Sequence, residues 1–229
     1  MIRMKRIGLV VAVEIDAVLE RYGEPLRSEH FGSFDLRVYR SGRNELYIMH
    51  SGVGEIAAAA ATQLLITVCK VDLVVNFGVV GGLTEEMAQS RSCIVEKVVH
   101  ADYDAEAIDG TKRGQYLELP DEFIPTDEKL FAAARRIAPD LRPVICASAD
   151  KFIADPVKKR ELHQLFGADI CEMEAAGIAL TCYRNQIPCL MIKTVSDGIT
   201  GGAEEYLSEV ARTSALCLQI AQKIMEEAL

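Results

Sequence analysis

Two short acidic motifs near the end of the chain contain residue types that can bind and act on a polar small molecule. Cys171-Glu172-Met173-Glu174 stands directly before Ala175-Ala176, and Ser196-Asp197 follows the apolar run that begins at Leu190. An apolar strand that ends in a charged residue carries that charge to the rim of a sheet, where open α/β proteins bind small molecules. A simpler alternative stays open, in which Glu174 only caps the helix that follows it.

Other predicted strands end in residues of similar interest. Glu14 and Asp16 follow the first apolar run, Gly52-Val53-Gly54 follows another, and Gly78-Val79-Val80-Gly81-Gly82 and Ser148–Ile153 follow two more. Glycines at a strand end let a backbone approach a ligand, although a lone Gly-x-Gly before a helix is more often a tight turn. The Gly-x-x-Gly spacing of a dinucleotide fingerprint is missing. Several strand ends are therefore expected to converge on one site, which is more informative than any single motif.

The hydrophobic pattern predicts the elements that position these residues. We expect strands at 7–13, 36–39, 45–50, 73–77, 93–99, 144–147 and 190–195, and helices at 15–22, 54–70, 127–137, 174–185 and 205–228. Alternating strands and helices with near-continuous apolar strands are typical of a sheet covered on both faces. No linker or repeat interrupts the pattern, so we predict an α/β protein with one domain spanning residues 1–229.

Composition excludes several classes of function. The net charge of −9 argues against a nucleic-acid surface, and the densest basic cluster, Lys158-Lys159-Arg160, is predicted to be a solvated helix face. No apolar stretch approaches the roughly 20 residues of a membrane span. The seven cysteines are an odd number without CxxC pairs, which favours buried reduced thiols in a cytoplasmic protein over disulfides or a zinc site.

In order and spacing, these segments resemble the nucleoside phosphorylase/hydrolase superfamily. Within it the chain is most similar to the bacterial 5′-methylthioadenosine/S-adenosylhomocysteine nucleosidases. The resemblance spans nearly the whole chain, and its most specific part is the pair Glu172-Met173-Glu174-Ala175 and Ser196-Asp197. It implies a mixed twisted central sheet flanked by helices, a purine nucleoside substrate, and neither a metal nor an organic cofactor. It also implies a homodimer, in which a partner loop around Tyr103–Tyr116 closes the 5′ pocket.

The resemblance also implies roles for the leaving-group and sugar contacts. Asp197 would be the general acid that protonates the purine N7, with Ser196 orienting it. Glu174 would hold the ribose hydroxyls, with Met173 and Glu172 beside it.

The same resemblance assigns the contacts with the base and the 5′ substituent. Phe152 would stack on the purine, and the backbone of Ile153 would contact its edge. Val53 and Tyr206 would line the pocket for the 5′ substituent.

This chain departs from the family pattern around the nucleophile. The family's water-activating glutamate aligns with Asp16, while Glu14 takes a neighbouring carboxylate position. The family serine is Val79 here, and the family arginine is Lys193. A re-formed water site with Asp16 or Glu14 as base, a phosphate acceptor, and low activity all stay open. We favour water, because phosphate needs several cationic contacts. The alternatives are a purine nucleoside phosphorylase and a nucleoside-binding protein without turnover.

Overall fold

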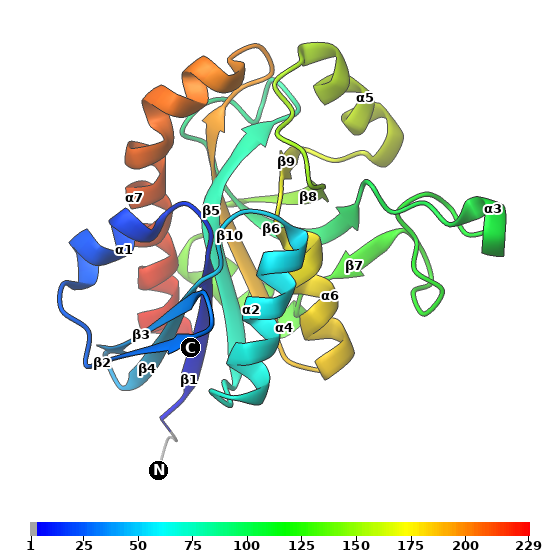
Figure 1. The fold of residues 1–229 in the computed structure, drawn as a ribbon. Helices are drawn as coiled ribbons and strands as arrows, with labels where there is room; N and C mark the ends of the chain where they lie inside the picture. Colours follow the sequence, from blue (N-terminus) through cyan, green and yellow to red (C-terminus); the bar gives the residue numbers. More distant parts are fainter. Residues whose placement is uncertain (1–3) are drawn as a thin grey trace.

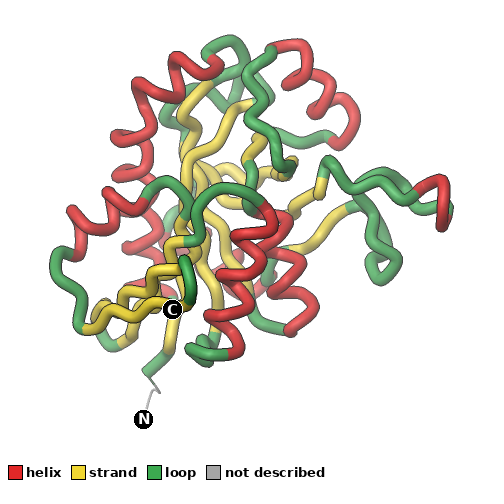
Figure 2. The backbone as a smooth tube through the Cα atoms, in the orientation of Figure 1, coloured by secondary structure: helices red, strands yellow, loops and turns green. Residues whose placement is uncertain are grey.

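A ten-stranded mixed sheet lies at the centre of the structure, and helices cover both of its faces (Figures 1 and 2). The computed structural model describes residues 4–229, so residues 1–3 of the predicted domain lie outside the described part. The strands are β1 (Arg6–Val11), β2 (Arg27–Phe31), β3 (Phe34–Ser41), β4 (Asn44–His50), β5 (Leu73–Gly82), β6 (Ser92–His100), β7 (Phe123–Pro125), β8 (Arg142–Ser148), β9 (Ile170–Glu172) and β10 (Cys189–Asp197). The helices are α1 (Ile15–Tyr22), α2 (Glu55–Thr67), α3 (Glu106–Asp109), α4 (Glu128–Ile137), α5 (Pro156–Phe166), α6 (Ala175–Asn185) and α7 (Gly202–Ala228).

Half of the sheet closes into a ring. The strand order is β10-β6-β8-β9-β5-β1-β4-β3-β2, with β7 paired to β6, and β10 also pairs with β5. Five strands, β5, β10, β6, β8 and β9, therefore form a closed circuit, and β1, β4, β3 and β2 extend from it as an open sheet. The pairings β1–β4, β1–β5 and β10–β5 are parallel, whereas β10–β6 and β5–β9 are antiparallel. This arrangement confirms the predicted mixed sheet.

Two groups of helices bury opposite faces of the sheet. Helices α2 and α6 pack on one face, where Ala58, Ala61 and Leu65 of α2 repeat at helical spacing. Helices α1, α4 and α7 pack on the other face, and Figure 1 places α1 and α7 across the sheet from α2 and α6. Residues Ala221 and Ile224 of α7 lie fully buried there. The helical periodicity of the sequence therefore corresponds to the buried faces.

Local sequence signals set several element boundaries. The Asp127 side chain accepts a hydrogen bond of 2.8 Å from the Leu130 N–H and caps α4. The Asp155 side chain caps α5 in the same way, and Gly167 ends that helix in the left-handed region at φ 64°. At the β3–β4 hairpin, Ser41 pairs with Asn44, and Gly42 has a φ of 55° in the turn. These signals were readable in the sequence.

Some predictions on the fold need correction. The strand predicted at 73–77 continues through the glycine run to Gly82, because β9 and β10 pair with its glycine end. The predicted solvated face of α5 is wrong for Lys159, which is fully buried, although Lys158 and Arg160 are exposed. Strands β2, β7 and β9 were not predicted. All seven cysteines are free and buried, as expected. Among the described residues, no helix is long and apolar enough to cross a membrane.

Candidate active site

A cleft of about 460 Å³ opens where the predicted strand ends converge. Its lining comes from the segment after β1, the turn before α2, the glycine end of β5, the segment after β8, the β9–α6 junction, the end of β10, and α7. The sequence-predicted residues that line it are Glu14, Val53, Val79, Phe152, Glu172, Met173, Glu174, Ser196, Asp197 and Tyr206. The structure therefore brings most of the predicted residues together.

Three predicted residues lie elsewhere. Ile153 lines a small adjoining hollow next to Phe152, Met173 and Asp197. Lys193 is 2% exposed and lies behind the cleft wall. Asp16 is exposed on the first turn of α1 and does not line the cleft, so its role as a site residue stays a prediction. Because α1 begins at Ile15, its first turn directs Asp16 to solvent and leaves Glu14 at the cleft.

The end of β10 delivers Asp197 to the cleft in a buried position. A β-bulge between Val195 and Asp197 shifts the register against β5, and bulges are a common means of redirecting a side chain. The Ser196 Oγ lies 2.9 Å from Asp197 Oδ1, and its orienting role stays a prediction. Asp197 is 1% exposed, and burial raises its pKa above the ordinary range, while hydrogen bonds from Lys159 and Ser196 oppose that rise.

The second oxygen of Asp197 meets a residue that the sequence analysis missed. Lys159 of α5 is 0% exposed, and its Nζ lies 2.6 Å from Asp197 Oδ2 and 2.7 Å from the Gly198 carbonyl oxygen. A signal was present, since Lys159, Leu162 and Phe166 are spaced along one face of α5, and Phe166 is buried with Leu162 packed against the same cluster. The neighbouring charges suggested solvent instead.

Glu172 and Glu174 divide two tasks at the start of α6. Glu174 occupies the N-cap position but makes no side-chain capping bond; instead its Oε1 accepts a hydrogen bond of 2.9 Å from the Gly54 N–H. The Glu172 carboxylate accepts hydrogen bonds from the Glu174 and Ala175 N–H groups, so it satisfies the helix end. The simple capping alternative therefore applies to Glu172, and the Glu174 carboxyl group faces the cleft. Burial and then the neighbouring Glu172 raise the pKa of Glu174 to about 8.

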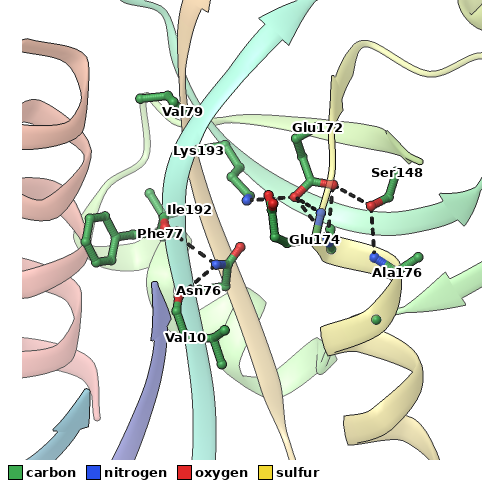
Figure 3. A network of polar contacts seen from close by, with 12 residues as sticks. Val10, Asn76, Phe77, Val79, Ser148, Glu172, Glu174, Ala176, Ile192 and Lys193 are labelled. Atoms are coloured by element: carbon green, nitrogen blue, oxygen red, sulfur yellow. Dashed lines mark hydrogen bonds and ion pairs between the residues drawn. The ribbon is translucent and has the colours of Figure 1, made fainter. Parts of the chain in front are cut away.

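A buried polar network supports Glu172 from behind, as Figure 3 shows. Lys193 Nζ lies 3.2 Å from Glu172 Oε2, and the Ser148 Oγ lies 2.5 Å from Glu172 Oε1. Burial alone would lower the pKa of Lys193, but the surrounding carboxylates, Glu172 first, raise it above its ordinary value. Lys193 therefore remains charged and is committed to this network.

Glu55 shares the Ser148 hydroxyl with Glu172. Its Oε1 also hydrogen-bonds the Ser148 Oγ, and its Oε2 accepts from the Gly177 N–H. One hydroxyl has only one proton to donate, so one of the two carboxyl groups must donate in turn. Burial and then Glu172 raise the pKa of Glu55 to about 7, which makes Glu55 the protonated partner.

Glu14 is held by backbone groups rather than by a cation. Its Oε1 accepts a hydrogen bond of 2.9 Å from the Val79 N–H, and its Oε2 accepts one of 3.1 Å from the Val13 N–H. Val79 lacks a side-chain donor, but its main chain supplies one. A Cβ added at Gly78 would lie 2.7 Å from Glu14 Oε1, so the glycine makes room for this carboxylate.

The two aromatic side chains of the site meet at the cleft mouth. Phe152 and Tyr206 pack edge to face with ring centroids 5.2 Å apart, although they come from the segment after β8 and from α7. Phe152 is 46% exposed, so its ring is available to a ligand. Their contact places the predicted purine and 5′-substituent contacts side by side.

Comparison with known proteins identifies the family of this fold and site. The sequence model of the Phosphorylase superfamily matches residues 6–229, and the chain belongs to that family. This confirms the predicted superfamily and fold.

Individual relatives give a more specific comparison than the family model. The chain is 31% identical over 222 residues to the 5′-methylthioadenosine/S-adenosylhomocysteine nucleosidase of Shewanella pealeana, covering 92% of this chain and 96% of that protein. The corresponding enzyme of Neisseria meningitidis, solved with methylthio-immucillin-A, superposes with a TM-score of 0.90 at 26% identity, covering 97% and 99% of the two chains. The fold also matches the Helicobacter pylori enzyme with a TM-score of 0.92 at 24% identity, over 98% of this chain and 99% of that one.

Proposed function

We propose that the protein hydrolyses the N-glycosidic bond of an adenine nucleoside, with 5′-methylthioadenosine and S-adenosylhomocysteine as substrates. One domain spanning residues 1–229 would carry the activity. The observation that carries the proposal is the buried pair Ser196–Asp197 facing the same cleft as Glu174 and Glu14. The nucleosidases to which the chain is similar supply the substrate class.

The base side of the cleft supports leaving-group protonation. Adenine is a poor leaving group as an anion, and a proton on N7 lets it depart as a neutral base. Asp197 is the carboxyl group that burial keeps protonated to higher pH than usual. Phe152 would stack on the purine, with Ile153 beside its edge.

The sugar side supports binding of the ribose and its developing positive charge. Glu174 would accept hydrogen bonds from the ribose hydroxyls, with Met173 and Glu172 around the sugar. Carboxylates near the anomeric carbon favour a cationic transition state over the neutral substrate. The glycosidic electron pair passes to the purine as the proton of Asp197 passes to N7.

The remaining carboxylate supports water as the nucleophile. We assign Glu14 as the base that takes a proton from the attacking water, because it lines the cleft and Asp16 does not. A phosphate acceptor fits poorly: no lysine or arginine from the described part of the chain lines this cleft, and Lys193 is committed to Glu172. The carboxylate of Glu14 would also repel a phosphate.

The 5′ end of the substrate would be enclosed by a second copy of the chain. Val53 and Tyr206 line the cleft here, and Val53 is 52% exposed. The arm that includes Tyr103–Tyr116 and α3 projects from the body of the protein, and Ile108 on α3 is 91% exposed (Figure 1). An exposed apolar side chain on a projecting arm suits a homodimer contact. The buried free cysteines support a reducing compartment, which we take to be the cytoplasm.

The decisive experiment measures base release from methylthioadenosine, adenosine and inosine, with and without inorganic phosphate. We expect adenine release without phosphate, fastest from methylthioadenosine. Strict dependence on phosphate would instead identify a phosphorylase. Thermal stabilisation by the nucleoside without any base release would identify a binding protein.

A further inference from the structure

Lys159 is a buried cation that the proposed chemistry does not yet use. Its side chain is 0% exposed on α5, and its Nζ contacts Asp197 Oδ2 at 2.6 Å and the Gly198 carbonyl oxygen at 2.7 Å. Removing an ammonium group from water costs several kcal/mol, which only close partners can offset. Packing alone does not explain a charged side chain in this position.

The surrounding backbone is shaped to admit the lysine. A Cβ added at Gly81 would lie 3.3 Å from Lys159 Nζ and 3.4 Å from Asp197 Oδ2. Gly81 pairs with Asp197 across the β5–β10 bulge, so the absence of a side chain there leaves room for the ion pair. With Ser196 on Oδ1 and Lys159 on Oδ2, each oxygen of Asp197 has a fixed partner.

The other ionisable groups near Asp197 include one more cation, Lys151, which lines the small adjoining hollow with Asp197 but pairs with Asp102 at 2.9 Å. Glu205 of α7 raises the pKa of Asp197, and its carboxylate also accepts a hydrogen bond of 2.8 Å from the Gly198 N–H. Cys171 of β9 and Tyr206 of α7 are neutral, because burial raises the pKa of each. Lys159 is therefore the cation placed directly on the acid.

We propose that Lys159 is a positioning residue that orients Asp197 and stabilises its carboxylate after the proton has passed to the purine. This inference rests on the proposed function. As the glycosidic bond breaks, its electron pair goes to the base and the Asp197 proton goes to N7. Lys159 keeps its own protons and faces the new carboxylate at the same contact. The water proton goes to Glu14, which then releases it to solvent, and solvent returns a proton to Asp197 for the next cycle.

The test compares the alkaline limb of the pH–rate profile in wild type and Lys159→Met, with methylthioadenosine as substrate. A nearby cation lowers a carboxyl pKa by roughly 1–3 units, so its removal keeps Asp197 protonated to higher pH. We expect the alkaline limb of kcat/KM to move up by about one unit or more, and kcat to fall roughly tenfold because Asp197 becomes a weaker acid. Lys159→Arg should return the alkaline limb to its wild-type pH. Lys158→Met, on the exposed side of the same helix, should change neither the position of this limb nor kcat.

A second substrate separates positioning from a merely structural role. A 4-nitrophenyl riboside has a leaving group that departs without a proton, so its hydrolysis should be nearly unchanged in Lys159→Met. In the Asp197→Asn background, Lys159→Met should cause no further loss of rate with methylthioadenosine. An unmoved alkaline limb, or an equal loss with both substrates, overturns the inference.

Two further outcomes are distinguishable. If Lys159→Met does not fold, Lys159→Gln removes the charge but keeps a hydrogen-bond donor one bond shorter, and it is judged by the same shift of the alkaline limb. If wild type itself releases no purine, the proposed function fails and this inference falls with it. If wild type is active but the alkaline limb does not move in Lys159→Met, the inference about Lys159 fails and the proposed function stands.

Discussion

Two lysines in the described part of the chain are buried, and each contacts a different carboxyl group of the cleft. Lys159 contacts Asp197, the proposed acid, at 2.6 Å, whereas Lys193 contacts Glu172 at 3.2 Å. The proposed base, Glu14, is held by the N–H groups of Val79 and Val13 instead. A cation on a carboxyl group favours loss of its proton, which suits an acid and would weaken a base. The contrast shows that one buried lysine lies beside the group that must give a proton, whereas backbone N–H groups hold the proposed base.

The largest effect should come from removing the acid. We expect Asp197→Asn to lower kcat by about 10³-fold, within the usual range for general acid catalysis, while nucleoside binding measured by calorimetry changes little. The variant should also melt at a lower temperature, since Lys159 loses its counter-ion. Retention of the full rate would remove Asp197 from the mechanism and with it the contrast between the two lysines.

The next effect distinguishes the two candidate bases. Glu14→Gln keeps the shape of the side chain but cannot take a proton, and its single amide oxygen can accept only one of the two backbone hydrogen bonds, so we expect kcat to fall by about 10²-fold. The matched control is Asp16→Asn on exposed α1, for which a change of less than about twofold is expected. Steady-state rates with methylthioadenosine check both. The reverse order of losses would return the base to Asp16.

A smaller effect is expected at the second lysine. Lys193 lowers the pKa of Glu174 against the larger effects of burial and Glu172, which together leave it raised to about 8. Removing this cation in Lys193→Met should raise that pKa further, so the ribose anchor stays protonated to higher pH. We therefore expect kcat/KM at pH 7 to fall roughly tenfold and the acidic limb to move up in pH. Lys193→Arg is the control, and an unchanged acidic limb would contradict the assignment.

The smallest effect concerns stability rather than rate. In the folded protein the pKa of Glu55 is raised from 4.5 to about 7, so the folded state binds more protons than the unfolded state between these values. The contribution of Glu55 is thus fully present below pH 4.5 and is lost as the pH rises to about 7. Glu55→Gln mimics the protonated form and should not lose it.

Urea unfolding at several pH values checks this prediction. Relative to wild type, Glu55→Gln should gain up to about 3 kcal/mol of unfolding free energy between pH 4.5 and pH 8. Ser148→Ala is a useful companion, because it removes the hydroxyl that the two carboxyl groups share. Parallel pH profiles for Glu55→Gln and wild type would show that Glu55 is ionised in the folded state.

Much of the site could be predicted because the ends of strands can be recognised in the amino-acid sequence. Apolar runs that stop at Asp197 or at Gly52-Val53-Gly54 place those residues at one rim, whatever the details of packing. The choice between Glu14 and Asp16 could not be made, because it depends on the single residue at which α1 begins. The burial of Lys159 was missed, because local charge density outweighed a helical spacing that only tertiary contacts reveal.

The fold class could be predicted from the sequence, but the closure of five strands into a ring could not. Alternating patterns predict a covered sheet, yet nothing local indicates that β10 pairs with both β5 and β6. The short strand β9 has only three residues, and its pairing depends on partners far away in the chain. Long-range pairings of this kind carry little local sequence signal.

The closed ring of strands also predicts which amide hydrogens exchange slowly with solvent and which exchange fast. At Ile192, Lys193 and Thr194 both edges of β10 are paired, so the amide hydrogens there should exchange with solvent only through global unfolding. Strand β2, at the open end of the sheet, has one free edge and largely exposed residues, and should exchange by local fraying. Arg27, Glu29 and His30 on that edge also discourage edge-to-edge aggregation between copies. Asp197 therefore sits on a strand that stays intact while the rim of the sheet opens and closes.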